Sequence, residues 1–187
     1  MRVERIQNLG QWGLYQAKKR DMESRGDPGH REMRLFHGTD EATVPKIVST
    51  AFNRSYCGKN MTAYGQGVYF ARDASYSAGD TYSRPNARGE KHIFFCRVLV
   101  GAYARGESSM RVPPDRPPGQ SKFDSTVDNV DAPTIFVVYH DAQALSLTIS
   151  PPLPPLSLSL SLSLSLSLSL FTPLSSLSLS LSRLPLT

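Results

Sequence analysis

The chain has 187 residues, enough for one domain with its own hydrophobic core, and carries a formal net charge of +5. This mild basic excess suits a polyanionic partner, but no nucleic-acid motif accompanies it, so nucleic acid is not specifically indicated and a solvated basic surface is the simpler interpretation. The two cysteines, Cys57 and Cys96, are not clustered with histidines, which gives a metal site little support. Unclustered cysteines and no signal peptide predict an intracellular protein of the cytoplasm or the nucleus, without a membrane partner.

The first predicted element is a helix over residues 11–24. Trp12, Tyr15 and Met22 can share one apolar face of this helix, with charged side chains opposite. Glycine and proline at residues 26–29 end the pattern. The segment is therefore expected to pack as an amphipathic helix on a core.

Between residues 34 and 82 short strands alternate with short helices. Residues 34–37 predict a strand that enters a turn, and residues 43–50 predict a helix. Residues 53–66 are loop-like, and residues 67–71 form a short apolar strand. Residues 73–82, rich in small and aromatic side chains, predict a further helix.

Two strands and a long loop complete the ordered pattern. Residues 92–100 give the clearest strand signal of the chain, and residues 134–140 give another. Between them, residues 106–120 hold four prolines and predict a loop. Strands flanked by loops, with only short helices between them, predict an α+β fold with mainly antiparallel sheets.

The composition changes after residue 145. Residues 146–187 consist almost only of Leu, Ser and Pro, with Arg183 as their sole charge, and Leu and Ser alternate without interruption over 156–170. Such a segment is of low complexity, and its serine content argues against a membrane-spanning helix. We therefore expect a folded domain over 1–145 and a disordered tail over 146–187.

Candidate ligand-binding residues occur in three places. They are His37-Gly38-Thr39, then Gly65-Gln66-Gly67 followed by Tyr69, and finally Ser77 with Tyr82. Glycines allow a ligand to approach the backbone, and His, Ser and Tyr can hold a polar aromatic ligand by hydrogen bonds and stacking. Spacing alone also permits a structural role for each: a histidine beside glycine, a core tyrosine on a strand, and packing side chains on a helix. No dinucleotide fingerprint of three spaced glycines is present.

The order of these motifs resembles the catalytic domain of the poly(ADP-ribose) polymerase family. The motifs are Leu35-Phe36-His37-Gly38-Thr39, Gly65-Gln66-Gly67-Val68-Tyr69-Phe70-Ala71 and Ser75-Tyr76-Ser77-Ala78. Residues 3–8 and 135–138 extend the resemblance, which covers nearly all of 3–145 and none of the tail. It is nearest to the macrodomain-containing, mono-ADP-ribosylating branch. It implies the ADP-ribosyltransferase fold and NAD⁺ as the co-substrate, with no metal.

The resemblance also implies how nicotinamide would bind. Gly38, through its backbone, and Ser77, through its hydroxyl, would hold the nicotinamide carboxamide. Tyr82 would stack on the nicotinamide ring, and Tyr69 would close the other side. Tyr76 belongs to the same motif and is counted with the cofactor-binding residues.

Further implied roles concern the sugars of NAD⁺. His37 would form a hydrogen bond with a ribose hydroxyl, Thr39 would lie near the adenosine ribose, and the loop over 53–64 would cover the cofactor. The chemistry builds positive charge on the ribose as the bond to nicotinamide breaks, so fixed geometry is what such a site must supply.

The third position of the family's catalytic triad determines the product. Polymer-forming members have a glutamate there, on the strand predicted at 134–140; in this chain the position falls on Ile135. Isoleucine can neither accept a proton nor a hydrogen bond, so repeated ribose-on-ribose addition lacks its general base. The predicted catalytic set is therefore His37, Tyr69 and Ile135, and the predicted function is an NAD⁺-dependent transfer of a single ADP-ribose to target proteins.

Two departures from the family pattern leave an alternative open. Family domains usually begin one strand and one helix before Val3, and they end with a further strand just after residues 141–145. Here the chain passes into Ser and Leu residues instead. A sheet that lacked this strand would have unpaired backbone groups and bare apolar surface. The alternative is thus an inactive NAD⁺-binding or scaffold module.

Overall fold

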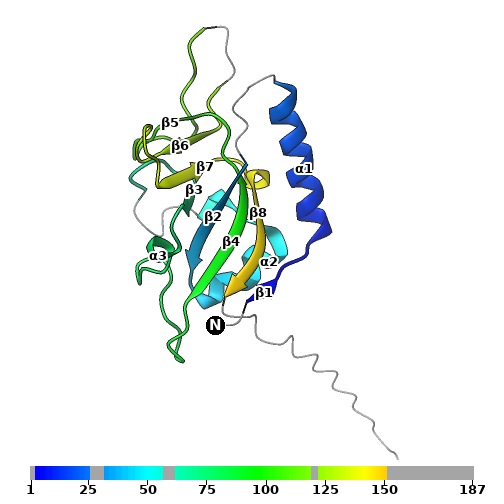
Figure 1. Ribbon diagram of the computed structural model, residues 1–187, viewed down its shortest axis with the longest axis vertical. Helices are drawn as coiled ribbons and strands as arrows, with labels where there is room; N and C mark the ends of the chain where they lie inside the picture. Colours follow the sequence, from blue (N-terminus) through cyan, green and yellow to red (C-terminus); the bar gives the residue numbers. More distant parts are fainter. Residues whose placement is uncertain (1–2, 26–31, 57–61, 119–121, 151–187) are drawn as a thin grey trace, which may run out of the picture. The chain divides into compact units, whose positions relative to one another are not determined.

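One mixed sheet dominates the computed structural model, which describes residues 3–25, 32–56, 62–118 and 122–150 (Figure 1). Eight strands within these ranges follow the order β1-β8-β4-β2-β3-β7-β6-β5. The strands are β1 Glu4–Arg5, β2 Glu32–Thr39, β3 Val68–Ala71, β4 His92–Leu99, β5 Tyr103–Arg105, β6 Ser125–Val127, β7 Ile135–Val138 and β8 Ala144–Ser150. The α-helices are α1 Leu9–Ser24, α2 Val44–Thr50 and α3 Ala74–Ser77, and 3-10 turns occupy Glu41–Thr43, Arg54–Tyr56 and Asp141–Gln143. The predicted α+β class is confirmed.

The strands pair antiparallel except β5 and β6, which are parallel. Pairing between β2 and β4 is continuous from Glu32–Leu99 to Thr39–His92. Between β2 and β3, in contrast, the register holds one pair, Phe36 with Ala71. The sheet therefore consists of two well-paired halves, β1-β8-β4-β2 and β3-β7-β6-β5, which meet at a single point.

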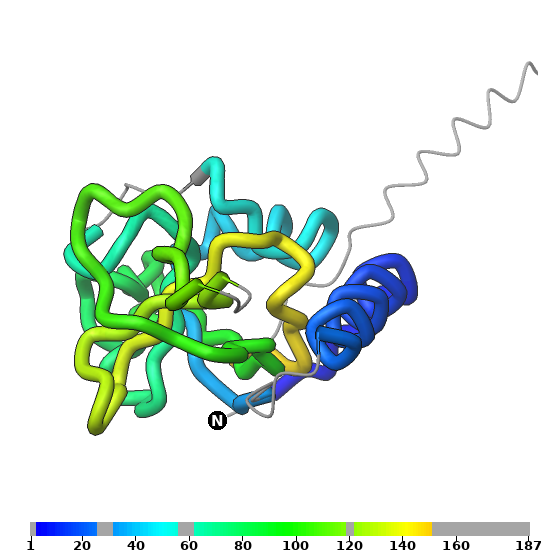
Figure 2. Tube along the Cα trace, turned by 90° about the horizontal axis from the view of Figure 1, so that it is seen from above, coloured from blue at the N-terminus to red at the C-terminus, as the bar shows by residue number. Residues whose placement is uncertain are grey.

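The main core lies against both halves of the sheet. Alternate residues of β4, among them Phe94, Cys96 and Val98, are fully buried in it, as the period of a strand requires. A smaller cluster fastens α1, where Tyr15 and Met22 pack on residues of β4 and β8. Seen from above, α1 runs beside the yellow β8 segment (Figure 2).

Helix α1 agrees with the predicted helix but differs in detail. It begins two residues earlier than expected, because the side chain of Asn8 caps it by accepting a hydrogen bond from the Gln11 amide at 3.1 Å. Gln11 is buried and donates to the carbonyl oxygen of Ile47 at 3.2 Å, which ties α1 to α2. Trp12 lies on the same side of the helix as Tyr15, with the two rings stacked at a centroid distance of 6.3 Å, but it remains 41% exposed.

The C-terminal strand corrects an important expectation. The domain was expected to end at residue 145 and to lack its last strand, yet Ala144–Ser150 is β8, which pairs with both β1 and β4. Ile149 is fully buried within it. The composition of residues 146–150 matched the tail, but their alternation of apolar and polar side chains is compatible with a strand. A register shift on β4 between Phe95 and Cys96 accompanies a change of face, since Leu147 packs on the α1 cluster and Ile149 in the main core. The tail beyond Ser150 lies outside the described residues, so its disorder stays a prediction.

Three further differences concern short elements. The helix predicted over 73–82 is a single turn, α3, so Tyr82 lies beyond it in a turn closed by the bond from the Tyr82 amide to the Gly79 carbonyl oxygen, 2.9 Å. Strands β5 and β6 were not predicted, since three residues give too short a pattern. The predicted strands at 34–37, 67–71, 92–100 and 134–140 are confirmed as β2, β3, β4 and β7 with shifted ends.

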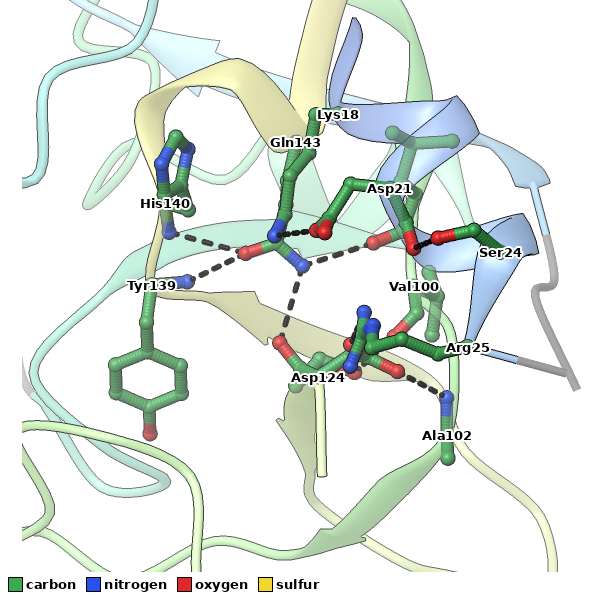
Figure 3. Close-up of polar contacts among 12 residues, drawn as sticks. Lys18, Asp21, Ser24, Arg25, Val100, Ala102, Asp124, Tyr139, His140 and Gln143 are labelled. Atoms are coloured by element: carbon green, nitrogen blue, oxygen red, sulfur yellow. Dashed lines mark hydrogen bonds and ion pairs between the residues drawn. The ribbon is translucent and has the colours of Figure 1, made fainter. Parts of the chain in front are cut away.

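A polar network fastens β8 to the rest of the sheet (Figure 3). The side-chain amide of Gln143 donates to the carbonyl oxygens of Leu99 and Asp124, each at 3.0 Å. Its oxygen accepts from the backbone amides of Tyr139 at 3.3 Å and His140 at 3.0 Å. One buried side chain thus satisfies four backbone groups from three segments, which fixes where β7 ends and β8 begins.

Candidate active site

The candidate pocket lies where β2 and β3 diverge. Since the two strands share only the pair Phe36–Ala71, residues 37–39 of β2 have no ladder partner on β3. A cavity of about 550 Å³ adjoins this divergence, within the range typical of sites for cofactor-sized ligands. All eight predicted site residues line it: His37, Gly38, Thr39, Tyr69, Tyr76, Ser77, Tyr82 and Ile135. The structure therefore brings them together, while their individual roles remain predictions.

His37 bridges the two diverging strands. Its Nδ1 lies 2.8 Å from the carbonyl oxygen of Tyr69. A carbonyl oxygen can only accept, so Nδ1 carries the hydrogen in this bond. Burial lowers the pKa of His37, and the bond to Tyr69 raises it. The effect of burial is the larger, so the pKa lies below its ordinary value. The neutral imidazole therefore has Nε2 without a hydrogen, and this nitrogen is an acceptor for a ligand hydroxyl.

Aromatic side chains fix the imidazole ring. The ring of Phe52 contacts that of His37 edge-on with centroids 5.0 Å apart, and Phe70 lies on another side at 5.5 Å. Phe52 in turn packs on Phe70 and on Phe94. Because Phe52 follows α2 and Phe94 belongs to β4, the main core itself determines the orientation of His37.

Tyr69 organises the glycine-containing turn before β3. Its hydroxyl donates to the carbonyl oxygen of Gly65 at 2.8 Å and accepts from the Tyr64 amide at 2.9 Å. The phenol is thereby held at both ends, by its own strand and by this turn. One face of the pocket is thus a tyrosine whose position is fixed before any ligand binds.

Gly38 and Ser77 form the narrowest part of the site. A Cβ at position 38 would overlap the carbonyl oxygen of Ser77, so β2 and α3 can approach this closely only with glycine there. The Ser77 side chain is 4% exposed and makes no hydrogen bond within the described ranges. A buried hydroxyl without a protein partner, beside exposed backbone, is suited to a ligand amide.

Tyr76 and Tyr82 form a stacked pair at the pocket. Their ring centroids lie 4.9 Å apart with 23° between the planes, and their hydroxyl oxygens are 2.7 Å apart. Burial raises the pKa of Tyr76, and the bond to Tyr82 raises it further, so the Tyr76 phenol stays neutral near pH 7. Tyr76 is 46% exposed, which places the pair at the entrance. Tyr76 therefore packs against Tyr82 from the solvent side.

Ile135 lies at the start of β7, opposite Ala71 of β3. Its side chain is 4% exposed and is apolar, so this wall of the pocket offers no proton acceptor. The carboxylate of Asp128 lies close to Ile135 but is already engaged in hydrogen bonds. It accepts from the backbone amide of Ile135 at 3.0 Å and from the backbone amide and the hydroxyl of Thr134. Burial raises the pKa of Asp128, but these bonds outweigh it and lower the value. Asp128 thus caps the hairpin.

Several pocket residues were not singled out from the sequence. They are Asp40, Lys46, Phe52, Arg84 and others from the segments around α2 and after α3. The predicted covering loop over 53–64 contributes Asn53, Thr62, Ala63 and Tyr64 to the lining, while 57–61 lies outside the described residues. Phe52, a large apolar side chain in a polar loop, was the available signal. Nothing in the sequence pattern marked Arg84.

The described residues contain neither a membrane-spanning helix nor a metal-binding cluster. None of the helices there is both long and apolar enough to cross a membrane. Nor do His, Cys, Asp and Glu side chains in those ranges gather into a group of three or more that could hold a metal ion.

Comparison with known proteins gives the family to which this fold and this pocket belong. Residues 1–110 match the family model described as the poly(ADP-ribose) polymerase catalytic domain. The chain belongs to this family.

Similar proteins are named as mono-ADP-ribosyltransferases. Human protein mono-ADP-ribosyltransferase PARP14 is 49% identical over 145 residues, which are 76% of this chain and 8% of that protein. Mouse protein mono-ADP-ribosyltransferase PARP10 is 44% identical over 146 residues, 78% of this chain and 15% of that protein. Mouse protein mono-ADP-ribosyltransferase PARP9 is 31% identical over 148 residues, 79% of this chain and 17% of that protein. The chain thus spans a small part of each relative.

Proposed function

We propose that this chain is the catalytic domain of an NAD⁺-dependent protein mono-ADP-ribosyltransferase, which transfers one ADP-ribose to a target protein and releases nicotinamide. The observation that carries the proposal is one pocket lined by His37, Tyr69, Ser77 and Tyr82, with Ile135 where chain elongation would need a carboxylate. The family and the names of the relatives support the same reaction. NAD⁺ and target proteins are the proposed partners, in an intracellular setting.

The narrow part of the pocket fits the nicotinamide end of NAD⁺. A planar ring between Tyr69 and Tyr82 would have aromatic faces on both sides. Its carboxamide would lie against Gly38, where only glycine permits close approach, and would use the unpartnered hydroxyl of Ser77. Both groups are neutral, so they orient the ring without requiring a strong acid.

His37 suits the neighbouring ribose. With Nδ1 donating to Tyr69, Nε2 is left to accept a hydrogen bond from a ribose hydroxyl. The imidazole would therefore fix the sugar relative to the ring that leaves. Thr39, at the end of β2, would lie near the adenosine ribose.

The reaction breaks the bond from the ribose C1′ to the nicotinamide nitrogen. The bonding electrons leave with nicotinamide, which becomes neutral, while C1′ gains positive charge and then bonds to the nucleophile of the target. Holding ribose and leaving group in a reactive geometry supplies much of the rate. None of the pocket residues has to form a covalent bond to the sugar in this scheme.

The acceptor side explains why one unit is transferred. Activation of a sugar hydroxyl for elongation requires a base, and Ile135 provides none. Asp128 is occupied by Thr134 and Ile135. An acidic side chain of the target needs no such base, because its carboxylate is already a nucleophile at neutral pH.

The alternative of an inactive binding module rested on two departures from the family pattern. One of them, the expected absence of the last strand, is removed, because β8 is present and paired on both sides.

The test is transfer from labelled NAD⁺ to candidate proteins, with His37→Ala as the matched control. Discrete single-unit labelling by the parent chain and none by the variant is the expected result. Polymer ladders would contradict the argument from Ile135. Labelling that survives His37→Ala would contradict the assignment of the pocket.

A further inference from the structure

Arg84 is a cation at the pocket without a counter-charge among the residues that the structure describes. It lines the cavity and is exposed, and no hydrogen bond or ion pair joins it to any other residue that the structure describes. Its neighbours in the same loop differ. The Nε of Arg88 pairs with Glu90 at 2.8 Å, and the Nζ of Lys91 pairs with Asp80 at 2.6 Å. A basic side chain without a partner beside a cavity is available to an anionic ligand.

Hydrogen bonds on both sides of Arg84 locate it along the pocket. The hydroxyl of Ser83 donates to the carbonyl oxygen of His92 at 3.1 Å, and His92 is the register partner of Thr39. On the other side, the side-chain amide of Asn86 donates to the carboxylate of Glu41 at 3.1 Å. Position 84 therefore lies at the end of β2 where Thr39 leads into the Glu41–Thr43 turn.

Both proposed ligand subsites lie near this position. Tyr82, two residues before Arg84, adjoins Gly38 at the proposed nicotinamide end, since a Cβ at Gly38 would lie 3.3 Å from the Cβ of Tyr82. Thr39, proposed for the adenosine ribose, is the register partner of His92, whose carbonyl oxygen accepts from Ser83. In NAD⁺ the group between the two ribosides is the pyrophosphate, which carries the negative charge of the molecule.

We propose that Arg84 binds the pyrophosphate of NAD⁺ and thereby distinguishes the dinucleotide from nicotinamide alone. The inference rests on the proposed function and adds a specificity-determining residue to it. A guanidinium presents its N–H groups in a planar fork that matches two phosphate oxygens, and such charge-assisted bonds are stronger than neutral ones.

The other charged residues of the lining fit this role less well. The Asp40 carboxylate accepts from the Thr43 amide at 2.7 Å and would repel a phosphate. Lys46, also in the lining, already takes part in another interaction. The backbone at Arg84 is anchored by Ser83 and Asn86, so little backbone ordering is needed when the ligand binds.

The test measures the Kd of NAD⁺, ADP-ribose and nicotinamide by calorimetry for the full chain and for Arg84→Ala, Arg84→Lys and Arg88→Ala. For Arg84→Ala we expect NAD⁺ and ADP-ribose to bind about tenfold more weakly, with nicotinamide unchanged. Arg84→Lys should retain part of the affinity, because it keeps the charge but loses the fork. Arg88→Ala, in the same loop but paired with Glu90, should bind like the parent. The difference should shrink with added salt, since Arg84 is exposed.

One result would overturn the inference alone: Arg84→Ala binds NAD⁺ as tightly as the parent chain. If this variant also shows a raised KM for a target protein, Arg84 is assigned to an acidic acceptor instead. If the parent chain binds neither nicotinamide nor NAD⁺, the proposed function itself fails, and the inference fails with it.

Discussion

Replacing Gly38 by alanine should damage catalysis far more than stability. The added methyl group would lie 3.0 Å from the carbonyl carbon of Ser77 and would overlap its oxygen. Carbon atoms ordinarily approach to about 3.5 Å, and here the obstacle is backbone that a change of rotamer cannot move. Strand β2 and helix α3 must therefore separate.

The size of the two effects follows from where the separation occurs. Overpacking of this kind costs about 1–3 kcal/mol of folding free energy. A displacement on the order of 1 Å at residues that position a substrate costs about 100-fold in rate. Since Gly38 and Ser77 are the proposed carboxamide contacts, kcat/KM for NAD⁺ should fall by about that factor.

The measurement is NAD⁺ turnover beside urea denaturation, with Gly13→Ala as the matched control. Gly13 is inside α1, and a Cβ there would have nothing within 4 Å. The control should gain up to about 1 kcal/mol through helix propensity and keep full turnover. If Gly38→Ala retains the turnover of the parent chain, the close approach of β2 to α3 has no role in binding, and the reasoning is refuted.

Three further predictions concern stability, each read from urea denaturation. Ala51, which ends α2 with φ 68°, occupies a conformation that favours glycine, so Ala51→Gly should stabilise by about 1 kcal/mol; a loss would contradict this. Gln143→Met keeps the side-chain length but leaves four backbone groups without their partner, so it should cost at least about 3 kcal/mol, and a loss below about 1 kcal/mol would sink the idea. Burial lowers the pKa of His37 in the folded chain, so below about pH 6.5 the unfolded chain takes up a proton on this imidazole more readily than the folded chain does. The free energy of unfolding should therefore decrease as the pH is lowered. His37→Phe should remove that part of the pH dependence, and an unchanged slope would contradict it.

The fold could be predicted from the sequence wherever an element carried a pattern of its own. Strand β4 has one face of buried side chains, and its run of apolar residues was visible in the chain. Strand β8 alternates apolar and polar residues, but it runs into a segment of the same composition, so its end at Ser150 could not be recognised. Burial against β4, which only the structure supplies, separates the two.

The site was predictable to the extent that its residues belonged to long motifs. His37, Tyr69 and Ser77 stand in such motifs, and all three line one pocket. Phe52 and Arg84 do not, because their role depends on where a loop lies in space. A residue of this kind is identified by its neighbours, and loops show them only once folded.

The divergence of β2 from β3 connects the fold with the chemistry. If the two strands were paired beyond Phe36 and Ala71, the backbone of Gly38 would be used by the ladder and no cavity would open there. The bond from His37 to the Tyr69 carbonyl oxygen replaces a ladder bond and holds the gap at a fixed width. The same bond leaves Nε2 as the free acceptor. One interaction thus sets both the shape of the pocket and the protonation of the side chain that would hold the ribose, so the two should be lost together in any variant that breaks it.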